Sequence, residues 1–101
     1  MHVLLSITRP VPAGQLQVYE LSWRRLRAAA GDVGVHAWRF RSAVVSEPTR
    51  YLEFLEWRAD RDDPTATGPL REALAELGDT LPGEAETWHE LAGEPSQERA
   101  P

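Results

Sequence analysis

The spacing of apolar residues changes several times along the chain, and each change marks a predicted element. Apolar residues concentrate in residues 3–7, which predicts a short strand stopped by the segment Arg9 to Pro12, because two prolines so close end ladder pairing. From residue 13 apolar side chains recur every three or four positions, as on one face of an amphipathic helix. These positions, which run as far as the glycines at 31 and 34, are Leu16, Tyr19, Trp23, Leu26 and Ala30.

In the second half of the chain the spacing of apolar residues again changes from that of strands to that of a helix. Residues 35–45 and 51–58 predict two strands joined by a turn at 46–50. Helical spacing also fits 51–58, but its aromatic content and the flanking turn favour a strand. After a polar loop at 59–68, apolar residues from Leu70 to Leu81 predict a second helix that begins at Pro69, and residues 86–91 predict a last strand.

The predicted order is strand, helix, strand, strand, helix, strand. This order is typical of an α+β, ferredoxin-like βαββαβ fold, in which a four-stranded antiparallel sheet carries two helices on one face. Residues 1–92 are expected to form this one domain. Residues 93–101 are polar and contain prolines, which predicts a disordered C-terminal tail.

Both sides of the predicted strands carry large apolar groups, which two helices on one face do not cover. An antiparallel sheet with a solvated face would alternate apolar and polar residues. We therefore expect two copies to pack sheet against sheet as a homodimer around a shared apolar pocket. The residues predicted to line that pocket and bind a ligand are His36, Trp38, Phe40, Tyr51 and Leu55.

Composition excludes several kinds of site and partner. A net charge of -5 disfavours nucleic acid, because phosphate binding needs a concentrated basic surface. The absence of Cys excludes disulfides and thiolate chemistry. The three His residues show no ligand spacing, so no metal is expected, and no phosphate loop or dinucleotide fingerprint predicts a cofactor. No stretch approaches the roughly 20 apolar residues of a membrane span, and the N-terminus does not resemble a signal peptide, so a cytoplasmic protein is expected.

Two local patterns add to the element order. The third predicted strand ends in Glu56-Trp57, and Leu70-Arg71-Glu72-Ala73-Leu74 opens the second helix. Over roughly residues 3–91 the chain resembles the dimeric α+β barrel superfamily, in particular the antibiotic biosynthesis monooxygenase type. The resemblance implies a barrel formed by two sheets and oxidation of a small aromatic substrate without metal, flavin or haem.

Members of that type that oxidise aromatic polyketides use a strand Asn, a Trp four residues later, a Tyr soon after it and an Arg on the second helix. Here Trp57 matches the Trp and Arg71 the Arg, but Glu53 stands at the Asn position and no Tyr follows. A carboxylate would repel a developing oxyanion that an amide stabilises, although Glu53 could act as a base if burial raised its pKa. The related haem-degrading enzymes use an Asn and a helix His that this chain lacks, so haem degradation is not expected.

The predicted catalytic residues are thus Trp57, Arg71 and Glu53, with His36 or His89 as further acid-base candidates. Each has a structural alternative. Trp57 would be an aromatic of the dimer core, Arg71 a solvated residue paired with a nearby Glu, and Glu53 half of an ion pair with Arg39 or Arg41. Three functions stay open: a cofactor-independent monooxygenase-like enzyme (or a cyclase or isomerase), a non-catalytic small-molecule-binding or accessory homodimer, and a purely structural dimer whose interior is packed shut.

Overall fold

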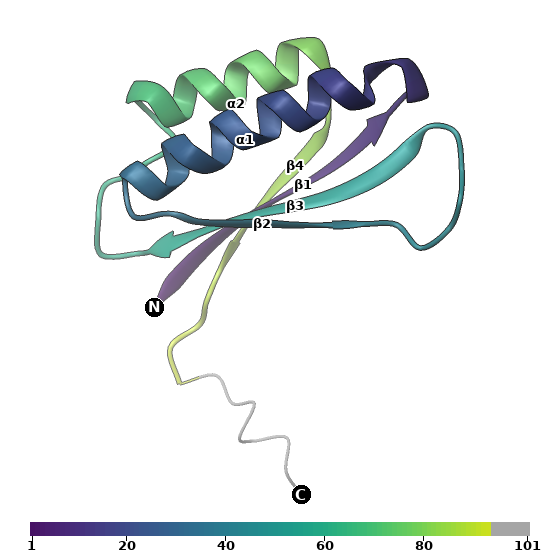
Figure 1. The fold of residues 1–101 in the computed structure, drawn as a ribbon. Helices are drawn as coiled ribbons and strands as arrows, with labels where there is room; N and C mark the ends of the chain where they lie inside the picture. Colours follow the sequence, from purple (N-terminus) through teal and green to yellow (C-terminus); the bar gives the residue numbers. More distant parts are fainter. Residues whose placement is uncertain (94–101) are drawn as a thin grey trace, which may run out of the picture.

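The computed structural model describes residues 1–93, which form a four-stranded antiparallel sheet and two helices (Figure 1). Sheet order is β2-β3-β1-β4, the ferredoxin-like arrangement that the element order predicts. The predicted tail lies, from residue 94 on, outside the described residues. The elements are β1 (His2–Val11), a short 3-10 turn (Ala13–Gln15), α1 (Leu16–Asp32), β2 (His36–Arg41), β3 (Thr49–Arg58), α2 (Gly68–Thr80) and β4 (Glu84–His89).

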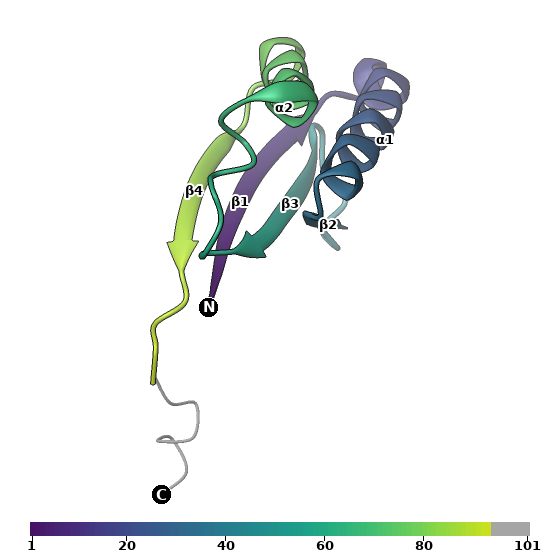
Figure 2. The ribbon, with the colours of Figure 1, turned by 90° about the vertical axis from the view of Figure 1, so that its left-hand side faces the viewer.

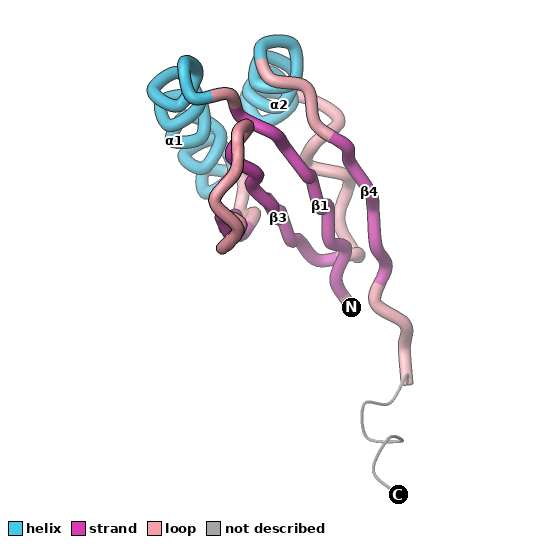
Figure 3. The backbone as a smooth tube through the Cα atoms, turned by 90° about the vertical axis from the view of Figure 1, so that its right-hand side faces the viewer, coloured by secondary structure: helices cyan, strands magenta, loops and turns pink. Residues whose placement is uncertain are grey.

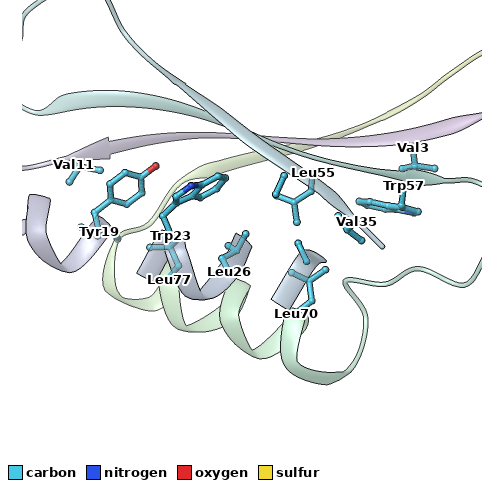
Figure 4. Close-up of a cluster of buried hydrophobic side chains, with 13 residues drawn as sticks. Val3, Val11, Tyr19, Trp23, Leu26, Val35, Leu55, Trp57, Leu70 and Leu77 are labelled. Carbon is cyan, nitrogen blue, oxygen red and sulfur yellow. The ribbon is translucent and has the colours of Figure 1, made fainter. Parts of the chain in front are cut away.

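Both helices lie on the same side of the sheet, as Figures 2 and 3 show from two directions. The apolar stripe of α1 and that of α2 face alternate residues of the strands, and the core lies between these two layers (Figure 4). Leu26, Leu55 and Leu77 are fully buried there, and each such side chain contributes roughly 1.5–3 kcal/mol by leaving water. The hydrophobic core is Val3, Val11, Tyr19, Trp23, Leu26, Ala30, Val35, Ala37, Leu55, Trp57, Leu70, Leu77 and Leu81.

Strand β1 is longer than the sequence predicts, because it continues through Pro10 to Val11 and pairs with β3 over its whole length. The expectation that the prolines stop this strand before Pro10 was wrong. The reason is that β4 pairs with β1 only as far as Thr8, opposite Glu84. Beyond Thr8 no strand within residues 1–93 pairs with this side of β1. A proline is tolerated there because its missing N–H is not required.

The hairpin between β2 and β3 also departs from its predicted bounds. Strand β2 ends at Arg41, whereas the sequence predicted a strand that continues to Val45, and β3 begins at Thr49, inside the predicted turn. Val45 is fully exposed, so its apolar side chain has no packing partner in the described chain that would hold it in a strand. The last strand is displaced by two residues, to Glu84–His89.

Within residues 1–93 no helix covers the second face of the sheet, and several large apolar side chains lie on it. Trp38 of β2 stacks on Phe54 of β3 with ring centroids 5.2 Å apart, and Phe40 meets the same ring edge-on at 6.0 Å. Phe40 is 59% exposed, and Leu52 and Trp88 are also exposed. We call this surface the open face. Its large apolar side chains are Leu4, Trp38, Phe40, Leu52, Phe54 and Trp88.

Candidate functional site

The predicted pocket residues divide between the two faces of the sheet. His36, Trp38 and Phe40 lie on the open face, whereas Tyr51 and Leu55 face the helices. The expectation that all five line one pocket was therefore wrong. Side chains alternate along a strand, and the register that pairs Trp38 with Phe54 puts the odd-numbered residues of β3 on the opposite side. Glu53 and Trp57 lie on the same helix-covered side of β3 as Tyr51 and Leu55. Trp38 and Trp57 therefore do not line the same pocket.

Glu53 is fully buried in a network of three charge-assisted hydrogen bonds. The Nε and Nη2 atoms of Arg9 each donate to its carboxylate at 2.9 Å, and the Tyr19 hydroxyl donates at 2.8 Å. Arg9 also donates to the backbone carbonyl of Leu81. The predicted partners, Arg39 or Arg41, were wrong, because the cation comes from β1. This is the geometry of a structural ion pair, and no part of the carboxylate is exposed to a cleft.

Tyr19 completes this network from helix α1. Burial, and then the negative charge of Glu53, raises the pKa of the Tyr19 hydroxyl well above its usual value. The hydroxyl therefore stays protonated and acts as a donor at every ordinary pH. Its ring lies 4.5 Å, centroid to centroid, from that of Tyr51.

Trp57 lines a cleft at the far end of the covered side, near β4. We call this the Trp57 cleft; its volume is about 340 Å³, within the range of ligand sites. Trp57, Val3 and His89 form a cross-strand row on β3, β1 and β4. With strands about 4.8 Å apart, Trp57 and His89 stand on either side of Val3. The full lining is Val3, Leu5, Trp57, Ala59, Arg61, Asp63, Thr65, Thr87 and His89.

The polar groups of the Trp57 cleft differ in how firmly they are held. Arg61 donates to the Val33 carbonyl at 2.6 Å, and Asp63 accepts from the backbone and hydroxyl of Thr65 at 2.8 and 2.6 Å. His89 is exposed and makes no side-chain hydrogen bond to any residue in 1–93. The imidazole is therefore the polar group of this cleft that is available to exchange a proton with a ligand.

Sequence reasoning named His89 but missed the loop residues Arg61, Thr65 and Asp63 as part of a site. The acidic loop 60–63 carries no local motif, and only the tertiary path of the chain shows that it borders Trp57. Arg71 is exposed on α2, does not line the Trp57 cleft, and forms no hydrogen bond or ion pair within residues 1–93. The ion pair predicted for Arg71 with a neighbouring Glu is absent from that part of the chain.

Within the described residues, no group of three or more His, Asp or Glu side chains is placed to hold a metal ion. Neither helix of this part combines the length and apolar character needed to cross a membrane.

A scan against protein-family models gave no match, and a search of curated proteins gave no significant one. Several solved structures share the fold. A proposed antibiotic biosynthesis monooxygenase from Bordetella bronchiseptica is 16% identical, with a TM-score of 0.66 over 89% of this chain and 97% of that chain. A second such protein, from Nitrosomonas europaea, is 12% identical with a TM-score of 0.68, over 93% and 94%.

The de novo designed protein Foldit4 also matches, with 10% identity and a TM-score of 0.60 over 90% of this chain and all of its own. A designed protein with this fold shows that the architecture alone carries no chemistry. The chain therefore has the ferredoxin-like α+β fold of the antibiotic biosynthesis monooxygenase structures, and its function has to be argued from its own side chains.

Proposed function

We propose that this chain is a cofactor-independent monooxygenase-like enzyme that works as a homodimer and binds a small aromatic substrate in the Trp57 cleft. The observation that carries the proposal is the row of Trp57, Val3 and His89 across three strands. It provides an aromatic wall, an apolar floor and an available base within one cleft of about 340 Å³.

The substrate class follows from these three groups. A planar ring lying over Val3 would contact the Trp57 indole on one side and reach the His89 imidazole on the other. His89 would remove a proton from an activated carbon of the substrate. The resulting carbanion can transfer electrons to molecular oxygen, so that a CH2 group becomes C=O with one oxygen atom while the other leaves as water. Arg61, at the rim, would stabilise negative charge on a substrate oxygen.

The homodimer is the second part of the proposal, and the open face supports it. The stacked Trp38 and Phe54 rings, with Phe40 and Leu52 beside them, form a contiguous exposed apolar surface. A second copy packed on this face would bury it. The Trp57 cleft lies on the other side of the sheet, so each protomer would keep its own cleft.

A second candidate function is a non-catalytic small-molecule-binding or accessory homodimer. The specific observation in its favour is that two of the three predicted catalytic residues do not reach the Trp57 cleft. Glu53 is held by Arg9 and Tyr19, and Arg71 is exposed elsewhere on α2.

Oxygen uptake with anthrone, whose activated CH2 group suits the proposed reaction, tests the proposal. We expect His89→Ala to lower kcat by about 10²–10⁴, the usual contribution of a general base. Trp57→Phe should raise KM through a weaker ring contact. His36→Ala, on the opposite edge strand, is the matched histidine control and should leave kcat unchanged.

The outcomes separate the two candidates. Oxygen uptake that survives His89→Ala would refute the assignment of the base. Anthrone binding without oxygen uptake, measured by calorimetry and weakened by Trp57→Ala, would favour the non-catalytic protein. Loss of turnover in Arg71→Ala alone would show that the reaction occurs outside the Trp57 cleft.

A further inference from the structure

Three arginines and two tryptophans line a separate cleft between helix α1 and the outer edge of strand β2. Its volume is about 380 Å³, above the roughly 300 Å³ at which ligand sites begin. Strand β2 is the edge opposite to β4, so this cleft is separate from the Trp57 cleft. We call it the α1–β2 cleft, and its walls are Glu20, Trp23, Arg24, Arg27, Trp38 and Arg39.

The charge of the α1–β2 cleft is opposite to that of the whole chain. The chain carries a net charge of -5, yet three of its 11 basic residues meet here beside one carboxylate. Arg39 donates from Nη1 and Nη2 to both oxygens of Glu20, at 2.6 and 2.8 Å, so these two charges largely offset each other. Among residues 1–93, Arg24 and Arg27 have no such ion-pair partner.

Arg24 and Arg27 are exposed, and neither forms a hydrogen bond or ion pair with any residue in 1–93. Arg24 nevertheless lies close enough to Glu20 to contribute, after Arg39, to lowering the pKa of the Glu20 carboxyl. Both arginines come from α1 at a spacing of three residues, which places them as neighbours on one helix face. Two free guanidinium groups therefore border the same opening.

The remaining walls of the cleft are packed against other side chains. The Arg39 guanidinium is 5.1 to 5.5 Å from the ring centroids of Tyr19, Trp23 and Tyr51. Trp23 is buried, and Trp38 is fixed by its stack on Phe54. A solvated arginine face on a helix has no such aromatic walls. Preformed walls of this kind lower the entropic cost of binding a ligand.

We propose that the α1–β2 cleft binds a small aromatic anion, a planar ring that carries a carboxylate or phosphate group. The ring would lie against Trp38, and the anionic group would accept hydrogen bonds from Arg24 and Arg27, whose planar forks suit both kinds of anion. The proposal does not depend on the reaction proposed for the Trp57 cleft, which involves other residues. It shares Trp38 with the open face, so the ligand would contact the part of that ring that a second copy leaves accessible.

Calorimetric titration of the full chain with 2-naphthoate tests the proposal, with 2-naphthyl phosphate as a parallel ligand and 2-naphthalenemethanol as the neutral analogue. We expect both anions to bind. The neutral analogue should bind at least about tenfold more weakly, the usual effect of losing a charge-assisted hydrogen bond. The double variant Arg24→Gln/Arg27→Gln should lose about tenfold or more in affinity for the anions.

Arg25→Gln is the matched control, because Arg25 is exposed on the same helix but does not line the cleft. It should change affinity by less than about twofold. If Arg25→Gln and the double variant lose the same affinity for the anions, binding depends on general charge attraction and the proposal is overturned. Equal binding of the neutral analogue would overturn it as well, and so would loss of naphthoate binding in Trp57→Phe.

The occupant can also be distinguished from an acidic protein segment. A peptide of Asp and Glu that binds with the same dependence on Arg24 and Arg27, where naphthoate does not bind, would overturn the small-molecule assignment. Whichever of 2-naphthoate and 2-naphthyl phosphate binds more tightly would identify the anionic group that the cleft prefers.

Discussion

Both faces of the sheet carry large apolar side chains, but their surroundings differ. On β3, Leu55 is fully buried beneath the helices, while Leu52, on the other side of the same strand, is 37% exposed on the open face. The covered face also holds two arginine–glutamate pairs, Arg9–Glu53 and Arg39–Glu20. The hydrophobicity of a strand residue therefore does not distinguish a core position from an interface position. Two ion pairs of the same chemistry are likewise expected to contribute differently to the free energy of unfolding, according to their exposure.

The largest expected effect comes from the buried pair. Replacing Glu53 by Gln leaves the Arg9 charge buried without its partner, which should cost roughly 3–5 kcal/mol of unfolding free energy. The matched change Glu20→Gln, at a pair whose carboxylate side chain is 41% exposed, should cost less than about 1 kcal/mol. Urea unfolding at one fixed protein concentration measures both. Equal costs would show that exposure does not separate the two pairs.

Leucine truncation on opposite sides of β3 should follow next in size. Leu55→Ala removes a fully buried side chain and should lower the unfolding free energy by about 2–5 kcal/mol. Leu52→Ala should cost the isolated protomer about 1 kcal/mol or less, because water already reaches this side chain. Denaturant midpoints at low protein concentration, where association is weak, compare the two. A larger loss for Leu52 would reverse the assignment of the faces.

A charge on the open face should break association while the fold survives. Phe54→Asp places a carboxylate beside Trp38 and should convert the proposed dimer into a species of 11.3 kDa. Light scattering gives the mass, and far-ultraviolet circular dichroism checks that the fold is kept. Val45→Asp, at a fully exposed apolar residue outside the sheet, is the control and should leave the mass unchanged. A wild-type protein that already scatters as 11.3 kDa would contradict the homodimer.

The smallest effect concerns acid. The hydrogen bond from Arg39 lowers the pKa of the Glu20 carboxyl below the usual 4.5. A carboxyl whose pKa is lower in the folded than in the unfolded state stabilises the fold at every pH above its unfolded-state pKa. That stabilisation is lost as the pH falls through the folded-state pKa. The stability difference between wild type and Glu20→Gln should therefore shrink as the pH falls below 4.5, and solvent screening should keep it under about 1 kcal/mol throughout. A stability difference between wild type and Glu20→Gln that grows as the pH falls would contradict the expected direction.

Element order could be predicted from the sequence because the change between periods of two and about 3.6 marks each strand and helix. The strand bounds at Pro10 and Val45 could not, because they depend on where a neighbouring strand ends. That Leu55 and Trp57 share a side could be predicted from the alternation along one strand, but the side was wrong, because both face the helices and not a pocket between two sheets. Which residues of β2 share their side depends on register, and register is a tertiary property.

The candidate site was predicted less completely than the fold. Trp57 was named from its strand pattern, but its neighbours Arg61 and Thr65 come from a loop without local signal. Arg9 was missed as the partner of Glu53 because the two lie 44 positions apart in the chain. Only the pairing of β1 with β3 brings them together, so no local spacing could reveal the pair.

The four tryptophans are divided equally between the core and the open face: Trp23 of α1 and Trp57 of β3 belong to the core, and Trp38 and Trp88 to the open face. The protein therefore carries an intrinsic optical probe for each of its two surfaces. In the absence of a ligand, emission from Trp38 and Trp88 should shift to the blue when copies associate, while Trp23 and Trp57 should respond when a protomer unfolds. Variants that retain one indole at a time would let fluorescence follow assembly and unfolding separately, one event per variant, without an attached dye.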